Sequence, residues 1–209
     1  MAKFREFSLC RADKTVLLLI SVMQSTKKAV GSDGSVYTLF FGSESIFSNF
    51  RPCESLEIEG IKYKCTEQYF MHQKAVTFGD KISAGKILKT SLPREMKRLG
   101  RKVTPFDAEK WKSASIDAMV KGNVHKYTQN VDLREELTKT AGVLVECNPR
   151  DRIWGIGLSI KNPDAADRKR WRGKNLLGRI LTEIRDCLQD DPTGAGEDVV
   201  NIVRKRILQ

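Results

Sequence analysis

Two side chains that could do acid–base chemistry stand seven residues apart in the segment that begins at Thr66. Thr66 is a good helix N-cap, because its hydroxyl can accept a hydrogen bond from a free backbone N–H group. Glu67 then falls in the first turn, where the helix dipole favours a carboxylate, and Lys74 lies about two turns further on the same face. Phe70 and Met71 between them would desolvate both charges, which suits acid–base or covalent chemistry. An ordinary ion-paired helix face is the alternative reading of this segment.

The elements around this segment predict an α+β fold, a mainly helical single domain around a small β-sheet. Helical stretches are many, strands are few and short, and the two kinds do not alternate as they would in a doubly wound sheet. A hairpin is expected at 56–63, because its residues alternate in polarity on either side of Glu59-Gly60. We expect further strands at 37–41 and 142–147, and helices at 66–79, 81–89, 93–100, 107–125 and 175–189, with another that begins at Asp132.

The chain of 209 residues is long enough for one domain with appendages. We expect residues 1–36 to form an N-terminal appendage, residues 37–189 to form the main domain, and residues 190–209 to form a linker and a short C-terminal helix. No apolar run is long enough to span a bilayer, and the apolar run from Val16 to Met23 is predicted to be a strand.

The five cysteines argue against a disulfide scaffold and against a zinc site. Their number is odd, and no Cys-x-x-Cys pair occurs. Reduced thiols in a cytoplasmic or nuclear protein are the simplest interpretation. We therefore expect no metal ligands and no cofactor, and an activity that resists EDTA.

Positive charge is concentrated in two blocks. Residues 81–129 carry 12 Lys and Arg against 4 Asp and Glu, and residues 168–189 carry 7 against 2. Such a surface attracts polyanions such as nucleic acid, or a smaller phosphorylated ligand. A solvated basic surface without any ligand is the alternative.

An ordered set of short motifs accompanies the Glu67 helix. They are Phe47-Ser48-Asn49-Phe50, Leu99-Gly100-Arg101, Asp107 with Trp111, Asp151-x-x-Trp154-Gly155-x-Gly157, and Gly173-Lys174-Asn175-x-x-Gly178. In this order they resemble the NADAR family of YbiA-like N-glycosidases, over most of the chain from Tyr37 to Leu188. The resemblance implies a mainly helical α+β fold and hydrolysis of a ribosyl N-glycosidic bond.

The resemblance also implies which residues do the chemistry. Glu67 matches the family glutamate tied to catalysis, and Asp151 and Trp154 match a loop with a second acidic position and a pocket tryptophan. One branch of the family cleaves early ribosylaminopyrimidine phosphates of riboflavin synthesis, and another removes ADP-ribose from guanine bases. Bacterial YbiA has an acidic residue where this chain has Ile156, and that departure favours the ADP-ribose branch.

Both substrate classes attach ribose to an exocyclic amine, whose nitrogen can push electrons toward C1′ and open the ring to an imine. Lys74 could capture that carbon as a Schiff base, with Glu67 as proton carrier and Asp151 orienting water or ribose hydroxyls. Direct attack of water, with Glu67 and Asp151 as a carboxylate pair, is the competing route.

The remaining predicted site residues would bind the substrate. Trp154 could stack on a base beside Gly155 and Gly157, or it could be a core tryptophan. Ser48, Asn49 and Phe50 could contact ribose or phosphate, or merely cap a loop. Arg101 could hold a phosphate. Lys174 and Asn175 open the last predicted helix, whose free N–H groups suit a phosphate, although Asn175 could simply cap that helix.

These features favour an N-glycosidase that removes ADP-ribose from guanine bases of DNA. Its partner would then be ADP-ribosylated nucleic acid. A YbiA-type hydrolase of small ribosyl phosphates is the alternative within the same class. A non-catalytic module that binds ADP-ribose or nucleic acid is the alternative from another class.

Overall fold

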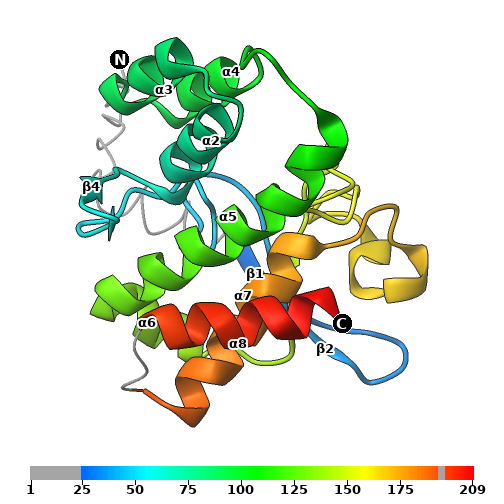
Figure 1. The fold of residues 1–209 in the computed structure, drawn as a ribbon. Helices are drawn as coiled ribbons and strands as arrows, with labels where there is room; N and C mark the ends of the chain where they lie inside the picture. Colours follow the sequence, from blue (N-terminus) through cyan, green and yellow to red (C-terminus); the bar gives the residue numbers. More distant parts are fainter. Residues whose placement is uncertain (1–24, 193–195) are drawn as a thin grey trace, which may run out of the picture.

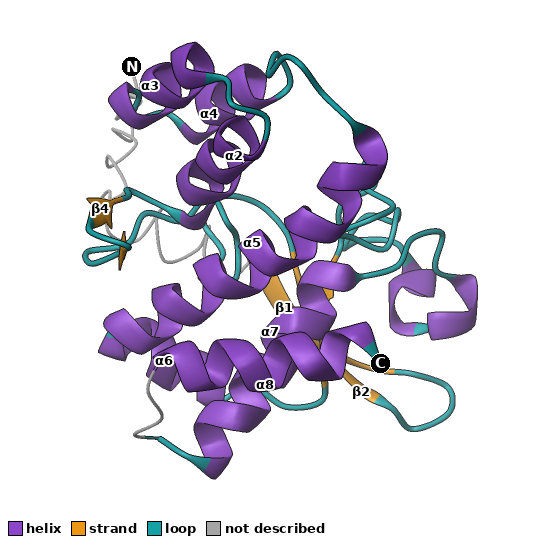
Figure 2. Cartoon of the chain, in the orientation of Figure 1, coloured by secondary structure: helices purple, strands orange, loops and turns teal. Residues whose placement is uncertain are grey.

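The computed structural model describes residues 25–192 and 196–209 and consists mainly of helices with a few short strands (Figure 1, Figure 2). In chain order the elements are β1 (Thr26–Val30), β2 (Val36–Phe40), β3 (Glu57–Ile58), β4 (Ile61–Lys62), α2 (Thr66–Thr77), α3 (Lys81–Lys89), α4 (Pro93–Gly100), α5 (Ala108–Gln129), α6 (Val131–Thr138), β5 (Val143–Glu146), η1 (Pro163–Ala166), η2 (Arg168–Arg170), α7 (Leu176–Asp190) and α8 (Gly196–Leu208).

The main sheet has the strand order β1-β2-β5. β1 runs antiparallel to β2, and β5 runs parallel to β2 with Phe40 opposite Glu146. Because β2 and β5 are parallel, the chain must cross over between them, and helices α2 to α6 form that crossover. β1 lies before residue 37, yet it pairs with β2 along its whole length.

Side chains alternate across this sheet, so its two faces pack against different parts of the chain. Phe40 and Leu144 belong to the large core that the helices form. Tyr37, Leu39 and Val145 belong to a smaller core on the opposite face, which the loop after β5 covers. The sheet therefore has the helical layer on one face and, on the other, the part of the following segment that carries Ile156, Leu158 and Ala165.

α5 lies at the centre of the helical layer and contacts α2, α6, α7 and α8 (Figure 1). A side chain at Gly122 would lie 2.7 Å from the Tyr69 ring, so glycine is what allows α2 to approach α5 this closely. α8 buries Val199, Val200 and Val203 against the same core. The C-terminal helix is thus part of the hydrophobic core and not a loose tail.

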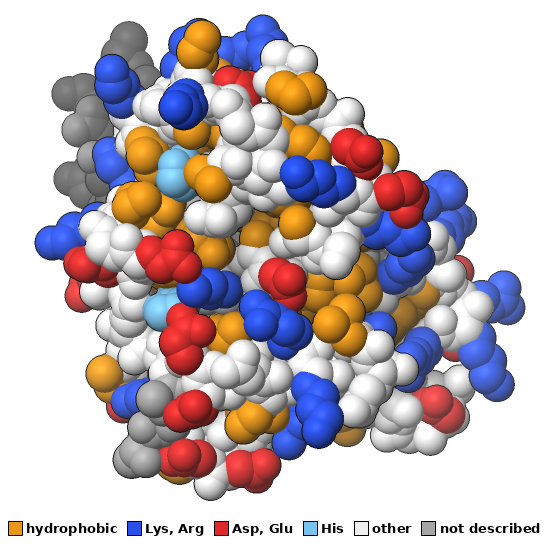
Figure 3. Space-filling model, viewed as in Figure 1, with side chains coloured by type: hydrophobic (Ala, Val, Ile, Leu, Met, Phe, Trp, Pro, Cys, Tyr) orange, Lys and Arg blue, Asp and Glu red, His pale blue; other side chains and the backbone are white. Residues whose placement is uncertain are grey.

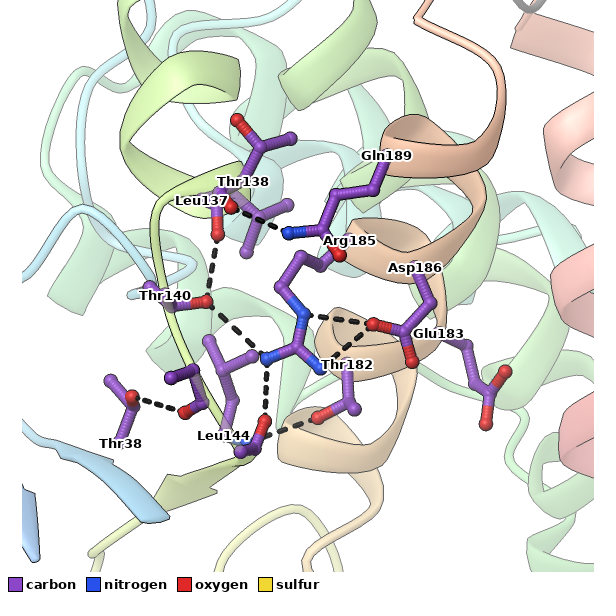
Figure 4. A network of polar contacts seen from close by, with 12 residues as sticks. Thr38, Leu137, Thr138, Thr140, Leu144, Thr182, Glu183, Arg185, Asp186 and Gln189 are labelled. Carbon is purple, nitrogen blue, oxygen red and sulfur yellow. Dashed lines mark hydrogen bonds and ion pairs between the residues drawn. The ribbon is translucent and has the colours of Figure 1, made fainter. Parts of the chain in front are cut away.

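Arg185 of α7 ties that helix to the connection between α6 and β5 (Figure 4). Its guanidinium donates to the carbonyl oxygen of Gly142, contacts Thr140 Oγ1 at 3.5 Å and pairs with Asp186 at 2.7 Å. Thr182 accepts a hydrogen bond from the Leu144 N–H at 3.0 Å. These contacts set β5 against α7 and so position the end of β5.

The structure confirms the mainly helical α+β fold, and most predicted elements occur within a few residues of their expected bounds. The expectation that Thr66 caps α2 is wrong. Cys65 is the N-cap residue, and Thr66 is the first residue of the helix, with a hydroxyl that is buried and has no partner in the described part of the chain. The strand predicted from Val16 to Met23 lies outside the described residues.

Candidate active site

Glu67 is buried at the start of α2, with 4% of its surface exposed. Its backbone N–H donates to the carbonyl oxygen of Asn49 at 2.9 Å, so the loop before the hairpin anchors this end of the helix. Within residues 25–192 and 196–209, its Oε1 atom has no hydrogen-bond partner. A buried carboxylate oxygen without a partner is costly, so it marks a position that a substrate could satisfy.

Burial and three charged side chains determine the pKa of Glu67. Burial raises its pKa, Lys97 lowers it, Asp151 raises it and Arg101 lowers it, with a net result of about 7. A carboxyl group with a pKa near neutrality can both give and take a proton at physiological pH. Asp151 and Arg101, which the sequence predicted as site residues together with Glu67, therefore both act on the charge of Glu67.

Asp151 is held by its own loop. Its Oδ1 atom accepts hydrogen bonds from the N–H groups of Ile153 at 3.0 Å and Trp154 at 2.8 Å. Its carbonyl oxygen accepts from the N–H of Gly157 at 3.1 Å, and Gly157 has a φ of 69°, which favours glycine. Gly155 has no room for a side chain, because a Cβ there would lie 2.8 Å from the carbonyl oxygen of Glu146. The two glycines thus shape the loop, and both are buried.

Three aromatic side chains, Trp111, Phe70 and Trp154, contact one another in a row that ends in the Asp151 loop. Phe70 lies 5.3 Å from the Trp111 ring and 5.5 Å from the Trp154 ring, the latter in an edge-to-face contact. Both tryptophans are only partly buried. Trp154 therefore packs on the core and still offers ring surface, a combination that suits stacking on a base.

Lys74 lies further along α2 and does not pair with Glu67. A separation of seven residues places them about 10 Å apart along the helix axis, and no ion pair between them occurs in the described residues. The Nζ atom of Lys74 instead lies over the Phe106 ring, 4.2 Å from its centre. Burial lowers the pKa of Lys74. The expectation of a closely held carboxylate–amine pair is therefore wrong, and the two groups could act on one ribose only if the Lys74 side chain left the Phe106 ring.

The predicted loop residues Ser48 and Asn49 mainly organise the loop itself. Ser48 Oγ accepts from the N–H of Phe50 at 3.1 Å. The Asn49 side chain is buried and contacts the Met119 sulfur at 3.1 Å and Asn123 at 3.2 Å. Phe50 is different, because it is partly exposed and its ring lies 5.8 Å from Lys97 Nζ. Of the three side chains, that of Phe50 contacts one of the charged residues that act on Glu67.

Helix α7 does not offer the free N–H groups that the sequence led us to expect. The N–H groups of Lys174, Asn175 and Leu176 donate to carbonyl oxygens of Arg152, Gly155 and Ile153. The Asn175 side chain is fully buried and donates from Nδ2 to the Leu144 carbonyl oxygen at 2.9 Å. The start of α7 therefore holds the Asp151 loop and β5, and the Lys174 side chain is exposed beside them.

Sequence reasoning missed two charged residues that interact with the group around Glu67, and a third, Lys126, that holds the loop at 46–48. Lys97 acts on Glu67, and Glu146 interacts electrostatically with both Lys97 and Asp151. Lys126 is fully buried and donates from Nζ to the carbonyl oxygens of Ile46 and Ser48, at 2.5 and 3.0 Å. A glutamate directly after the apolar run at 143–145 was the only sequence signal for Glu146, while Lys97 and Lys126 looked like ordinary helix lysines.

The described residues contain no group of three or more His, Cys, Asp or Glu side chains that could hold a metal ion, so the three carboxyl groups do not form such a set. No helix among residues 25–192 and 196–209 is long and apolar enough to cross a membrane. Ile156, expected to bear on substrate choice, is fully buried in the smaller core and offers no surface to a substrate.

The chain belongs to the NADAR domain family, whose model matches residues 39–189. Protein irg-1 of Caenorhabditis elegans is 39% identical over 180 residues, which cover 78% of this chain and 85% of that protein. N-glycosidase R617 of Acanthamoeba polyphaga mimivirus is 37% identical over 161 residues, which cover 72% of this chain and 95% of the viral protein.

The fold is also that of a solved relative. The NMR structure of Escherichia coli YbiA superposes with a TM-score of 0.61 at 28% sequence identity, and the match covers 76% of this chain and 88% of YbiA. YbiA is itself named as an N-glycosidase. The family is therefore NADAR, and the relatives R617 and YbiA are N-glycosidases.

Proposed function

We propose that the protein is a ribosyl N-glycosidase that removes ADP-ribose from guanine bases of DNA. The observation that carries the enzymatic part is Glu67, a buried carboxyl group with an unpartnered oxygen and a pKa of about 7. Asp151, Lys97 and Arg101 are the charged groups around it. Such a setting suits a proton carrier and is unusual for a merely structural glutamate.

In the proposed reaction Glu67 gives its proton to the ring oxygen of the ribose. The exocyclic nitrogen of the base supplies electrons to C1′, the bond from C1′ to the ring oxygen breaks, and a C1′=N iminium forms. The Asp151 carboxylate, held by two backbone N–H groups, orients a ribose hydroxyl or the attacking water. Arg101 and Lys97 would balance negative charge on the phosphates.

Two routes complete the cleavage. In the first, the Lys74 side chain leaves the Phe106 ring and extends back along α2 toward Glu67, so that its neutral amine adds to C1′ and expels the base amine. Water then hydrolyses the Schiff base and returns the proton to Glu67. The lowered pKa of Lys74 supports this route, because burial favours the free amine. In the second, water attacks C1′ directly with Glu67 and Asp151 as the carboxylate pair.

A basic surface favours a nucleic acid as the acceptor. The segment that carries Asp151 and Trp154 is rich in exposed cations, which include Arg150, Arg152, Arg168, Lys169, Arg170, Arg172 and Lys174. Blue side chains gather at the right-hand edge of Figure 3, on the side where η1 and η2 lie in Figure 1. Phosphate contacts of this kind give affinity along a backbone without reading sequence. Trp154 would then stack on the modified base beside the cations, as in proteins that bind single strands.

YbiA-type hydrolysis of ribosylaminopyrimidine phosphates is the second candidate. The shared fold with YbiA favours it, and Arg101 or Lys174 would suit the single phosphate of such a substrate equally well. A catalytically silent module that binds ADP-ribose is the third. An unpartnered, proton-bearing Glu67 argues against that option, because a binding module has no need of such a group.

The substrate comparison tests the proposal. The purified protein is incubated with a guanine-ADP-ribosylated DNA strand and, separately, with ribosylaminopyrimidine phosphate, and released ADP-ribose or ribose 5-phosphate is quantified by chromatography. We expect turnover of the DNA and little of the pyrimidine. The reverse preference would support the YbiA-type activity, and binding of ADP-ribosylated DNA without turnover would support the silent module.

A further inference from the structure

Glu146 is a second glutamate whose side chain faces the helical layer. It lies at the carboxyl end of β5, where Leu144 points into the large core and Val145 and Cys147 point into the smaller one. Since side chains alternate along a strand, Glu146 lies on the same face as Leu144. The helix that carries Glu67 belongs to that face, and Phe40, the partner of Glu146 in the sheet, packs there as well.

The backbone of Glu146 is held on both sides. Its N–H donates to Asn175 Oδ1 at 3.0 Å, and its carbonyl oxygen accepts from the N–H of Ile156 at 2.9 Å. Asn175 is fully buried and has a left-handed conformation with a φ of 53°. Asn175 thus combines a sparsely populated backbone conformation with a hydrogen bond to Glu146. Such a conformation occurs where the surrounding structure fixes it, often at functional sites, so we take the position of Glu146 to be important.

Glu146 is partly buried as a residue, and within the described residues no hydrogen bond or ion pair holds its carboxyl group. Asp151 of the loop and Lys97 of α4 act on it electrostatically, and Glu146 in turn acts on the Cys147 thiol, which points to the other face of the sheet. Burial raises the pKa of Glu146, Asp151 also raises it and Lys97 lowers it, with a net result of about 8. Glu67 shares both Asp151 and Lys97 as charged neighbours.

We propose that Glu146 is a protonated carboxyl group of the substrate site and that it donates a hydrogen bond to a ribose hydroxyl of the bound ribosyl phosphate. This rests on the proposed function, since that function supplies a ribosyl ligand. Three carboxylates cannot all be ionised beside one lysine at low cost. Asp151 already accepts two backbone N–H groups, whereas no donor in the described residues holds the Glu146 carboxyl group, so the proton stays on Glu146.

The test uses the affinity for ribose 5-phosphate, which both candidate substrates contain, measured by NMR titration between pH 7.5 and pH 9.5. We expect the affinity of the wild type to fall about fivefold to tenfold as Glu146 loses its proton. Glu146→Gln should bind a few-fold more weakly than the wild type at pH 7.5 but show no fall with pH, because a carboxamide keeps its N–H donors. Glu146→Ala should bind about tenfold more weakly at every pH.

The matched control is Glu135→Gln, an exposed glutamate on α6, which should behave as the wild type. A second measurement, the carbon-13 NMR titration of the Glu146 carboxyl group assigned with the Gln variant, reads its protonation directly. A midpoint below pH 6, or a Gln variant whose affinity falls with pH as in the wild type, would overturn the proposal. Cleavage is not needed in either measurement, so failure of the proposed reaction would be seen separately in the substrate comparison.

Discussion

The backbone N–H of Glu67 donates to the carbonyl oxygen of Asn49 at 2.9 Å, so the loop at 41–50 sets the start of the helix that carries the central carboxyl group. The loop in turn depends on Lys126, whose buried ammonium group binds the carbonyl oxygens of Ile46 and Ser48. A lysine on α5 thereby positions a glutamate on α2 through two loop carbonyls. This chain of contacts places Glu67 without any direct bond to its side chain.

Lys126→Met should therefore weaken both stability and activity. Two buried carbonyl oxygens would lose their donor, at a cost of about 2–4 kcal/mol in the free energy of unfolding. Activity should fall about tenfold or more in the folded protein, because the start of α2 is no longer fixed. Chemical denaturation and initial rates measure the two effects. Lys112→Met, an exposed lysine on the same helix, should change neither, and an unaltered Lys126→Met protein would refute the positioning role.

The raised pKa of Glu67 predicts how stability depends on pH. A carboxyl group with a folded-state pKa near 7 stabilises the fold below its unfolded value of 4.5, and that stabilisation is lost as the pH rises through 7. At about 1.4 kcal/mol per pKa unit, the loss is at most about 3–4 kcal/mol. Glu67→Gln lacks this titration and should gain stability over the wild type as the pH rises from 5 to 8. Equal pH dependence of the two melting temperatures would contradict the burial of an unpartnered carboxylate.

The Schiff-base route predicts a covalent adduct at Lys74. Treatment with borohydride during turnover should reduce the imine and attach the ribosyl group to Nζ, which peptide mass spectrometry would locate. Lys74→Ala should abolish the adduct and lower kcat by about a hundredfold or more. An adduct at Lys97 would transfer the role to that residue. Full activity of Lys74→Ala without any adduct would leave the direct attack of water.

The basic surface predicts salt-dependent binding of DNA. Arg152→Glu combined with Lys174→Glu should weaken the binding of single-stranded DNA about tenfold or more and lower the slope against the logarithm of salt concentration by about 1 to 2. Lys28→Glu with Lys205→Glu, a pair of exposed lysines on β1 and α8, is the matched control. If the two double variants bind alike, the acceptor is not recognised through this surface.

Much of the fold followed from local patterns. The helix at 93–100 could be predicted from Pro93 and Gly100, and the long helix after Asp107 from its cap, because these signals act within a few residues. The cap at Cys65 could not, since the N–H of Glu67 is satisfied by a loop carbonyl that is distant in sequence. Sequence patterns report on residues that are close along the chain, whereas the hydrogen bond from Glu67 to Asn49 is a tertiary contact.

Only part of the candidate site could be predicted, because some of its residues come together through tertiary packing. Glu67, Asp151 and Arg101 could be picked out by residue type and motif, and they do interact through their charges. Lys97 and Glu146 could not, because only the packing of α4 and β5 brings them near the others. Asn175 was predicted to be a phosphate ligand, yet its side-chain amide hydrogen-bonds to the backbone of Glu146 and Leu144 in β5. Residue type indicates possible chemistry, and burial decides which partner the side chain has.

The most direct test compares Glu67→Gln with the wild type in the release of ADP-ribose from guanine-ADP-ribosylated DNA. The account predicts that the variant is folded, binds the DNA with an affinity within about threefold of the wild type, and cleaves at least about a thousandfold more slowly, because the carboxamide cannot give the proton. Glu135→Gln should cleave as the wild type does. A Glu67→Gln protein that retains more than about a tenth of the wild-type rate would contradict the claim that Glu67 carries the chemistry.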